Sequence, residues 1–281
     1  MEVKAYAKLN LTLDIIRKRE DGYHDLQMVM QSIALCDSLN ITPAEGEGMM
    51  STNLSYLPTD GRNLAQMAAA AFREATGLGG EVDIAIEKNI PVCAGMGGGS
   101  SDAAAVLRAM NELNGASLSA MELAKIGERV GSDVPYCVLG STALAEGRGE
   151  ILTPLPALPH CWVAVCKPAF PVSTPQLFGT VDVRKIVRRP DTAGLMAALE
   201  SGDLVGVARR MYNVFEDVME PRRRGEIESI KAVMIDCGAL GASMSGSGPT
   251  VFGLFDNKAA AEEACSRLSE LYKNVYLSET V

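Results

Sequence analysis

The sequence predicts an α+β protein that is built from two domains. In both halves of the chain, stretches with the two-residue period of a strand alternate loosely with stretches that have helical spacing. The 281 residues are enough for two domains. Three prolines from Pro154 to Pro159 interrupt both periods, which indicates a linker. We therefore expect an N-terminal domain over residues 1–155 and a C-terminal domain over residues 156–281.

The overall composition is that of a globular protein. Hydrophobic residues make up 47% of the chain, and no apolar run approaches the length of about 18 residues that marks a membrane span. The net charge of −9 disfavours nucleic acid and anionic membranes as partners, and the basic runs at 184–189 and 222–224 are expected on solvated faces. Seven cysteines without a C-x-x-C pair favour reduced thiols. We expect a cytoplasmic protein.

The periodicity predicts the elements of the first half. Apolar and polar residues alternate from Ala5 to Ile15 and again over 82–86, which predicts two strands. Helices are expected over 63–76 and 119–130, because apolar residues recur at helical spacing and a glycine follows each segment.

The second half predicts strands at both ends and helices between them. Strands are expected over 162–165, 250–255 and 275–277, and helices over 192–200, 204–218, 226–236 and 258–272.

The most informative segment is a glycine-rich loop between the strand at 82–86 and a helix. Four glycines lie within the five residues 95–99, and two serines follow them directly. Bare backbone N–H groups at a helix N-terminus bind phosphate. The lysine of a P-loop and the spacing of the Rossmann fingerprint are both missing. The loop therefore predicts a nucleotide phosphate site of another type, and the alternative is a flexible turn or a simple helix entry.

The residues after the glycines are expected to begin the helix. Ser100, Ser101 and Asp102 offer side chains for its N-cap, and Asn114 with Gly115 is a stop signal. The two serine hydroxyls can also donate to phosphate oxygens or bind Mg²⁺.

Three polar residues outside the loop are candidates for chemistry. Lys8 and Asn10 are two apart on the first predicted strand, so both side chains point to one side, although a lysine on a polar strand face is usually solvated. Asp133 follows a helix stop at Gly131, and Pro135 is expected to prevent a regular helix. Its carboxylate is thus expected on a constrained loop, either as a turn residue or as a catalytic group.

Three segments are similar to the three motifs of the GHMP kinases, a family that transfers the γ-phosphoryl group of ATP to small alcohols and acids. They are Ala5–Leu11, Ile90–Ala105 and Gly241–Thr250, and Asp21–Gln27 and Gly131–Tyr136 match as well. The resemblance implies the two-domain GHMP kinase fold, with ATP bound by the first domain, substrate bound by the second, and the active site in the cleft between the domains. It implies ATP with Mg²⁺ as the cofactor and leaves the metal ligands unnamed.

The resemblance also implies the roles of individual residues. Asp133 matches the catalytic base, and Lys8 matches a catalytic lysine that stabilises charge on the transferred phosphoryl group. The residues that match the ATP site are Asn63, Lys88, Pro91, Val92, Cys93, Ala94, Gly95, Met96, Gly97, Gly98, Gly99, Ser100 and Ser101. Those that match the substrate site are Asn10, Tyr23, His24, Thr174, Phe178, Gly246 and Ser247.

Three aromatic residues distinguish between the members of this family. Tyr23, His24 and Phe178 match a platform for cytosine, which implies a small-molecule substrate that carries a cytidine diphosphate group. A kinase of the mevalonate or homoserine type is an alternative, but its substrate has no base to stack. A catalytically silent nucleotide sensor is a second alternative, and the presence of both Lys8 and Asp133 argues against it.

Overall fold

The computed structural model describes every residue from Met1 to Val281, and the chain forms two compact units. The first unit contains Met1–Ala7, Cys36–Val92 and Gly97–Gly140, and the second contains Lys8–Leu35, Cys93–Met96 and Ser141–Val281. Both units therefore take residues from the N-terminal half of the chain. The predicted domain division at residues 155 and 156 stays a prediction.

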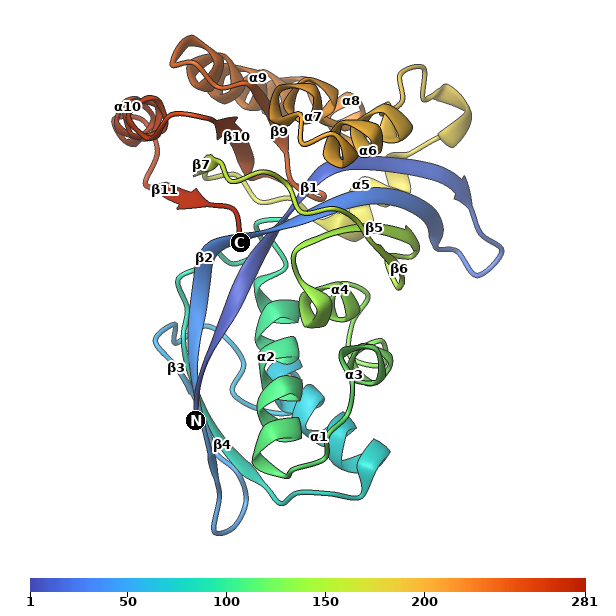
Figure 1. The fold of residues 1–281 in the computed structure, drawn as a ribbon, viewed down its shortest axis with the longest axis vertical. Helices are drawn as coiled ribbons and strands as arrows, with labels where there is room; N and C mark the ends of the chain where they lie inside the picture. The colour runs from blue at the N-terminus through green and yellow to red at the C-terminus, as the bar shows by residue number, and fades with distance from the viewer. The chain divides into compact units, whose positions relative to one another are not determined.

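The first unit consists of helices beside a small group of strands (Figure 1). Strand β4 (Val82–Glu87) pairs antiparallel with residues 38–43 of β2 (His24–Pro43) and parallel with β3 (Met50–Thr52). Helix α2 (Gly98–Leu113) contacts the other three helices of the unit, and the run of alanines at 103–105 on α2 is fully buried. These three helices are α1 (Leu64–Thr76), α3 (Ala120–Gly127) and α4 (Val134–Leu139).

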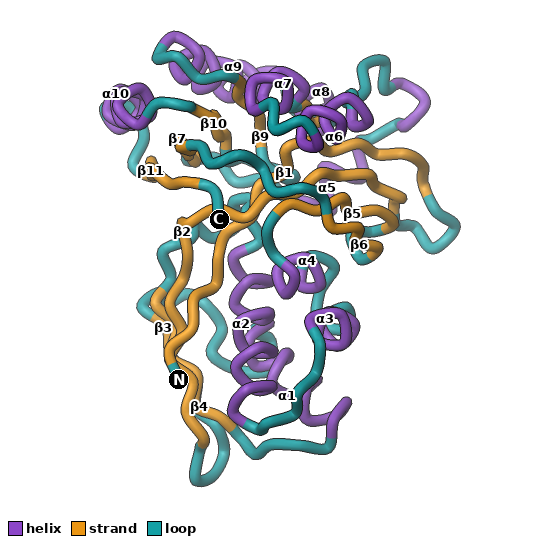
Figure 2. Tube along the Cα trace, in the orientation of Figure 1, coloured by secondary structure: helices purple, strands orange, loops and turns teal.

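The second unit contains an antiparallel sheet with the strand order β11-β7-β10-β9. Its strands are β7 (Trp162–Lys167), β9 (Gly241–Met244), β10 (Val251–Phe255) and β11 (Asn274–Glu279). Helices α9 (Pro221–Asp236) and α10 (Lys258–Ser269) pack against this sheet (Figure 2). Apolar residues from β7, β9, β10 and both helices form the core here, among them the fully buried Phe252, Phe255 and Ile230.

Further strands lie wholly or partly in the second unit. Strand β1 (Glu2–Lys18) pairs with β2 and, in parallel, with the short β8 (Tyr212–Asn213), while β2 pairs antiparallel with β5 (Thr142–Gly147). Strand β6 (Ile151–Pro154) follows beside β5. The remaining helices are α5 (Thr174–Thr180), α6 (Thr192–Glu200), α7 (Leu204–Arg210), α8 (Phe215–Val218) and a 3₁₀ turn at Val183–Lys185.

Most of the predicted elements are confirmed. Helix α1 begins after Asn63, whose side chain accepts from the N–H of Ala65, and ends at Gly77 in the left-handed conformation, as its sequence predicts. Helix α6 has the predicted bounds. Helix α3 ends three residues earlier than expected, and α9 begins five residues earlier, with Pro221 in its first turn.

The prediction of one helix over residues 204–218 is wrong. The helical spacing continues through this segment, but Tyr212 and Asn213 are extended and pair with Thr12 and Leu13 of β1. Tertiary pairing with β1 replaces the helical hydrogen bonds at this point, so two short helices flank β8.

The expectation that Pro135 prevents a helix is also wrong. Asp133 is the N-cap residue of α4, and Pro135 lies in the first turn. The missing N–H of a proline has no cost there, because the first N–H groups of a helix lack partners in any case.

Three bulk expectations can be compared with the structure. All seven cysteines are free thiols. No helix combines the length and the hydrophobicity needed to span a bilayer. The basic run at 184–189 is not entirely a solvated face, because Arg189 donates to the buried carboxylate of Asp14 at 2.7 Å.

Candidate active site

The glycine loop leads into helix α2 through left-handed backbone. Gly95 and Gly97 have φ angles of +73° and +68°, which favour glycine. The first hydrogen bond of α2 runs from the N–H of Ser101 to the carbonyl of Gly97, so the N–H groups of Gly98, Gly99 and Ser100 have no partner in the helix. These three donors lie at the positive end of α2, an arrangement that favours an anion.

The prediction that Ser100 to Asp102 cap this helix is wrong. The N-cap residue is Gly97, no side chain caps it, and the three polar residues lie inside the first turns. The Ser101 hydroxyl instead donates to the carbonyl of Tyr6, and Asp102 pairs with Lys88. The Ser100 hydroxyl is half-buried and makes no hydrogen bond within the protein, so it remains available to a ligand.

A buried cluster of two carboxylates and one lysine lies beside the start of α2. The Lys88 ammonium donates to Asp37 and, at 2.5 Å, to Asp102. Asp37 also accepts from the N–H groups of Asn89, at 2.6 Å, and Ile90, at 2.8 Å. The cluster thus fixes the backbone that enters the glycine loop. Sequence reasoning assigned Lys88 to ATP and missed Asp37, which lies 51 residues before Lys88 on another strand.

With both carboxylates ionised, the cluster would carry one more negative than positive charge, which disfavours the ionised form of Asp102. Burial raises the pKa of Asp102 to about 7, and the nearby Asp37 adds to the rise while Lys88 opposes it. One oxygen of Asp102, Oδ1, is buried without a hydrogen-bond partner. A carboxyl group in this setting favours its protonated form.

The two glycine-rich loops of the sequence touch each other in the second unit. A Cβ on Gly95 would lie 2.2 Å from the carbonyl oxygen of Ser245, and one on Gly246 would lie 3.0 Å from the carbonyl oxygen of Gly95. The Ser245 hydroxyl donates to the carbonyl of Gly95 at 2.8 Å and accepts from the N–H of Asn10 at 3.3 Å. Close backbone packing therefore requires glycine in both loops.

The polar face of β1 is buried rather than solvated. Lys8 is only 4% exposed, and its ammonium donates to the side-chain oxygen of Asn10 at 2.7 Å, which confirms that the two side chains share one side of the strand. Its backbone N–H donates to the carbonyl of Met96 at 3.0 Å. Lys8 belongs to the second unit and Asp133 to the first, so their use in one reaction stays a prediction.

The predicted aromatic platform is only partly assembled as expected. The rings of His24 and Phe178 stack with centroids 5.1 Å apart, and Phe215 meets Phe178 edge-on. Tyr23 is 56% exposed and does not face Phe178; instead the Arg148 guanidinium lies 5.3 Å from the centre of its ring. Nothing in the sequence pattern pointed to Arg148.

His24 is the polar member of this group. Burial, with a smaller contribution from Lys18, lowers the pKa of His24, so the neutral imidazole is favoured. Its Nε2 atom is buried without a hydrogen-bond partner. Two other predicted substrate residues contact each other: the hydroxyls of Thr174 and Ser247 form a hydrogen bond of 2.6 Å.

Two predicted ATP residues have structural partners. The Asn63 side chain caps α1 and also donates to the carbonyl of Pro58 at 2.8 Å. Lys88 is held in the carboxylate cluster described above. Cys93 is exposed and has a positive φ of 51°, which is uncommon outside glycine. The roles of these three residues toward ATP stay predictions.

Comparison with known proteins identifies the family. The models of the N-terminal and C-terminal domains of GHMP kinases match residues 63–141 and 195–274. A 4-diphosphocytidyl-2-C-methyl-D-erythritol kinase from Alkaliphilus oremlandii is 46% identical over 280 residues, which cover 99% of this chain and 96% of the relative. A kinase of the same name from Clostridium kluyveri is 45% identical over 281 residues, which cover 100% of this chain and 100% of the relative.

The chain belongs to this family of GHMP kinases. It is therefore a small-molecule kinase with ATP as the phosphoryl donor, and the two-domain GHMP kinase fold is confirmed. A crystal structure of a 4-(cytidine 5'-diphospho)-2C-methyl-D-erythritol kinase matches with 35% identity and a TM-score of 0.82, over 100% of this chain and 99% of that one.

More distant structures share the fold alone. An L. major mevalonate kinase is 18% identical with a TM-score of 0.74, and a homoserine kinase from Cytophaga hutchinsonii is 19% identical with a TM-score of 0.73. The match covers 100% of this chain in both cases, and 95% and 94% of the two proteins. Because kinases for different substrates share the fold, the substrate must be argued from side chains.

The contact between the two glycine loops predicts a large effect of a single methyl group. We expect Gly95→Ala to lower the free energy of unfolding by about 2 to 4 kcal/mol, because it adds both left-handed strain and an overlap with the Ser245 carbonyl. Gly202→Ala is the matched control, since Gly202 has a φ of +67° and no atom within 4 Å of its Cβ position. It should cost about 1 kcal/mol. Equal losses in chemical denaturation would contradict the loop contact.

The carboxylate cluster predicts a pH dependence of stability. The folded pKa of Asp102 is raised, so the folded state keeps a proton that the unfolded state loses between about pH 4 and pH 7, and stability falls as the pH rises through this range. The slope from one such group is at most about 1.4 kcal/mol per pH unit. Asp102→Asn should flatten this slope, measured as unfolding free energy against pH. The exposed Asp236→Asn should leave the slope unchanged, and the same slope in all three proteins would refute the assignment.

Proposed function

We propose that this kinase transfers the γ-phosphoryl group of ATP to the 2-hydroxyl of 4-diphosphocytidyl-2-C-methyl-D-erythritol, in the cytoplasm, as a step of the non-mevalonate route to isoprenoid precursors. The observation that carries the substrate assignment is the His24 imidazole, which is stacked on Phe178 with its Nε2 buried and unpartnered. An aromatic face next to a polar atom without a partner is suited to a nucleobase. The relatives at 46% and 45% identity, both named 4-diphosphocytidyl-2-C-methyl-D-erythritol kinase, agree with this assignment.

The phosphates of ATP are proposed to bind at the start of α2. The N–H groups of Gly98, Gly99 and Ser100 lack helical partners, and the helix dipole adds to their attraction for anions. Mg²⁺ fits this site as a companion of ATP, because it usually keeps water and phosphate ligands and needs few protein oxygens, and the Ser100 hydroxyl is one that is available. When bound, it would neutralise charge on the phosphate oxygens.

The proposed chemistry needs one base and one fixed positive charge. Asp133 accepts the proton of the acceptor hydroxyl while the hydroxyl oxygen attacks the γ-phosphorus of ATP. The bond between the γ-phosphorus and the oxygen that bridges it to the β-phosphate breaks, and ADP leaves. Asn10 holds the Lys8 ammonium in one orientation, so Lys8 can stabilise the charge of the transferred group without first being reoriented.

The base of the substrate is proposed to bind at His24 and Phe178. Their ring centroids are 5.1 Å apart, whereas a base between two rings requires roughly 7 Å, twice the van der Waals spacing. The base therefore either moves Phe178 away from His24 or stacks on the outer face of the pair. In both cases the base lies parallel to the pair and stacks on a ring, and the lowered pKa of His24 keeps its imidazole neutral.

The proposed role of Asp133 predicts a loss of turnover. Asp133→Asn keeps the shape of the side chain but cannot accept the proton, so we expect kcat to fall on the order of a hundredfold, with little change in ATP affinity. Asp203→Asn, at the N-cap of α7, is the matched control and should keep its activity because asparagine also caps helices. Turnover near that of the wild type in Asp133→Asn would rule out the base.

The proposed substrate predicts a preference for cytidine. We expect kcat/KM for the cytidine substrate to exceed that of its uridine analogue and of methylerythritol phosphate by at least about tenfold, because stacking contributes roughly 1 to 3 kcal/mol and a wrong base leaves polar groups unpaired. His24→Ala should reduce this preference. His160→Ala, which changes the only other histidine, should keep it. Similar values for all three substrates in the wild type would point to another GHMP kinase activity.

A further inference from the structure

The buried side-chain amide of Asn213 makes hydrogen bonds to the backbone of the C-terminal glycine loop. Asn213 is fully buried in β8, and its Nδ2 donates to the carbonyl of Met244 at 2.7 Å and to the carbonyl of Gly246 at 2.8 Å. Its Oδ1 accepts from the N–H of Phe215 at 3.0 Å. Both protons of the amide and one lone pair of its oxygen are thus bonded to backbone, which fixes the orientation of the side chain.

Strand β1 in turn fixes Asn213. Residue Asn213 pairs with Leu13 in the parallel ladder of β1 and β8, and the N–H of Val214 donates to the carbonyl of Leu13 at 3.1 Å. The same strand carries Lys8 and Asn10 a few residues earlier. Asn213 therefore connects the strand of the proposed catalytic lysine to the loop of the proposed substrate site.

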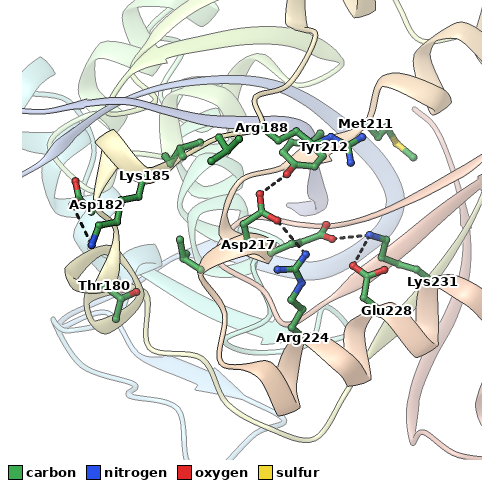
Figure 3. A pocket seen from close by; sticks show the side chains of 14 residues that line it. Thr180, Asp182, Lys185, Arg188, Met211, Tyr212, Asp217, Arg224, Glu228 and Lys231 are labelled. Atoms are coloured by element: carbon green, nitrogen blue, oxygen red, sulfur yellow. Dashed lines mark hydrogen bonds and ion pairs between the residues drawn. The ribbon is translucent and has the colours of Figure 1, made fainter.

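A carboxylate next to Asn213 holds the residue where the loop begins. Glu216 accepts from the N–H of Met244 at 2.8 Å and from the hydroxyl of Ser243 at 3.1 Å, and Lys231 donates to it at 2.7 Å. Glu216 also lines a cavity of about 730 Å³ in the second unit (Figure 3). The figure shows Lys231 bonded to Glu228 as well, so the charges on this wall are paired.

The pattern of donors and acceptors in the loop suits an anion. The carbonyls of Met244 and Gly246, whose negative ends would repel a diphosphate, are turned to the Asn213 amide. The N–H groups of Gly246 and Ser247 make no hydrogen bond within the protein. Successive free N–H groups next to a glycine with positive φ, here Gly246 at +58°, form an anion-binding concavity.

We propose that Asn213 is a positioning residue for phosphoryl transfer, because it holds the Met244 and Gly246 carbonyls and so presents the N–H groups of Gly246 and Ser247 to the diphosphate of the acceptor. This inference rests on the proposed function for the identity of the acceptor. Asn213 itself touches no reacting atom. It acts through the loop, and the loop contacts Gly95 of the phosphate loop through Ser245.

The test compares Asn213→Ala with a matched asparagine variant. The side chain of Asn111 also makes hydrogen bonds to backbone with both its amide nitrogen and its amide oxygen, through the carbonyl and the N–H of Leu118, but Asn111 belongs to the first unit, whereas the loop belongs to the second. In Asn213→Ala we expect the KM for the cytidine acceptor to rise about tenfold or more while the KM for ATP stays within about twofold. Asn111→Ala should change neither constant, even if both variants lose the same thermal stability.

Amide hydrogen exchange supplies a readout that does not depend on the substrate. Exchange at residues 244–248 should accelerate in Asn213→Ala and not in Asn111→Ala. An unchanged acceptor KM with unchanged exchange would overturn the proposal, and so would a parallel rise of both KM values. If the wild type fails to phosphorylate the cytidine acceptor, the proposed function is wrong, whereas the exchange comparison still decides whether Asn213 holds the loop.

A second variant covers a failure of the first to fold. Asn213→Asp keeps the volume of the side chain and the acceptor for Phe215, but replaces the donor by an oxygen that repels the two carbonyls. It should raise the acceptor KM at least as much as the alanine variant. If neither variant folds, Asn213 is required for folding alone and the proposal is wrong.

Discussion

The packing of two glycine loops against one strand is the constraint on which the rest of the site depends. The N–H of Lys8 bonds to Met96, and the N–H of Asn10 bonds to the Ser245 hydroxyl, which in turn bonds to Gly95. The first of these bonds joins two backbone groups, and the Ser245 hydroxyl makes the other two. A Cβ on Gly95 or Gly246 would meet the backbone of the other loop, so the two loops pack closely. Strand β1 also carries the Lys8 and Asn10 side chains. These bonds therefore fix the positions of both side chains relative to the two glycine loops within the second unit.

Much of the fold could be predicted because the signals are local. A capping asparagine and a following glycine delimit α1, and the glycine cluster marks the start of α2 within a few residues. The shared side of Lys8 and Asn10 follows from the two-residue period of a strand. Each of these features is set by residues close in sequence, so the printed order of residues is enough to find them.

The features that were missed depend on partners far apart in the chain. Residues 204–218 keep a helical pattern, yet pairing with β1 extends Tyr212 and Asn213, and this pairing is invisible in the local sequence. Asp37 acquires its role only because β2 lies beside β4, where it meets Lys88. Periodicity finds the face of an element, but it does not say which side chain on another element will meet it.

The entries to the two glycine loops are held in the same way. Asp37 accepts from the N–H groups of Asn89 and Ile90 before the first loop, and Glu216 accepts from the N–H of Met244 before the second. A lysine neutralises each carboxylate, Lys88 in the first case and Lys231 in the second. Glycine loops have no side chains with which to anchor themselves, so their position has to come from neighbouring side chains that bond their backbone.

Burial of a carboxylate is costly unless it is paired and hydrogen-bonded, and here the lysine supplies the opposite charge while the loop backbone supplies hydrogen bonds. The same bonds that satisfy the buried charges therefore hold the backbone of the two loops, which we propose to bind phosphate, in place without a ligand. N–H groups that are fixed in this way stabilise a transferred phosphoryl group most strongly.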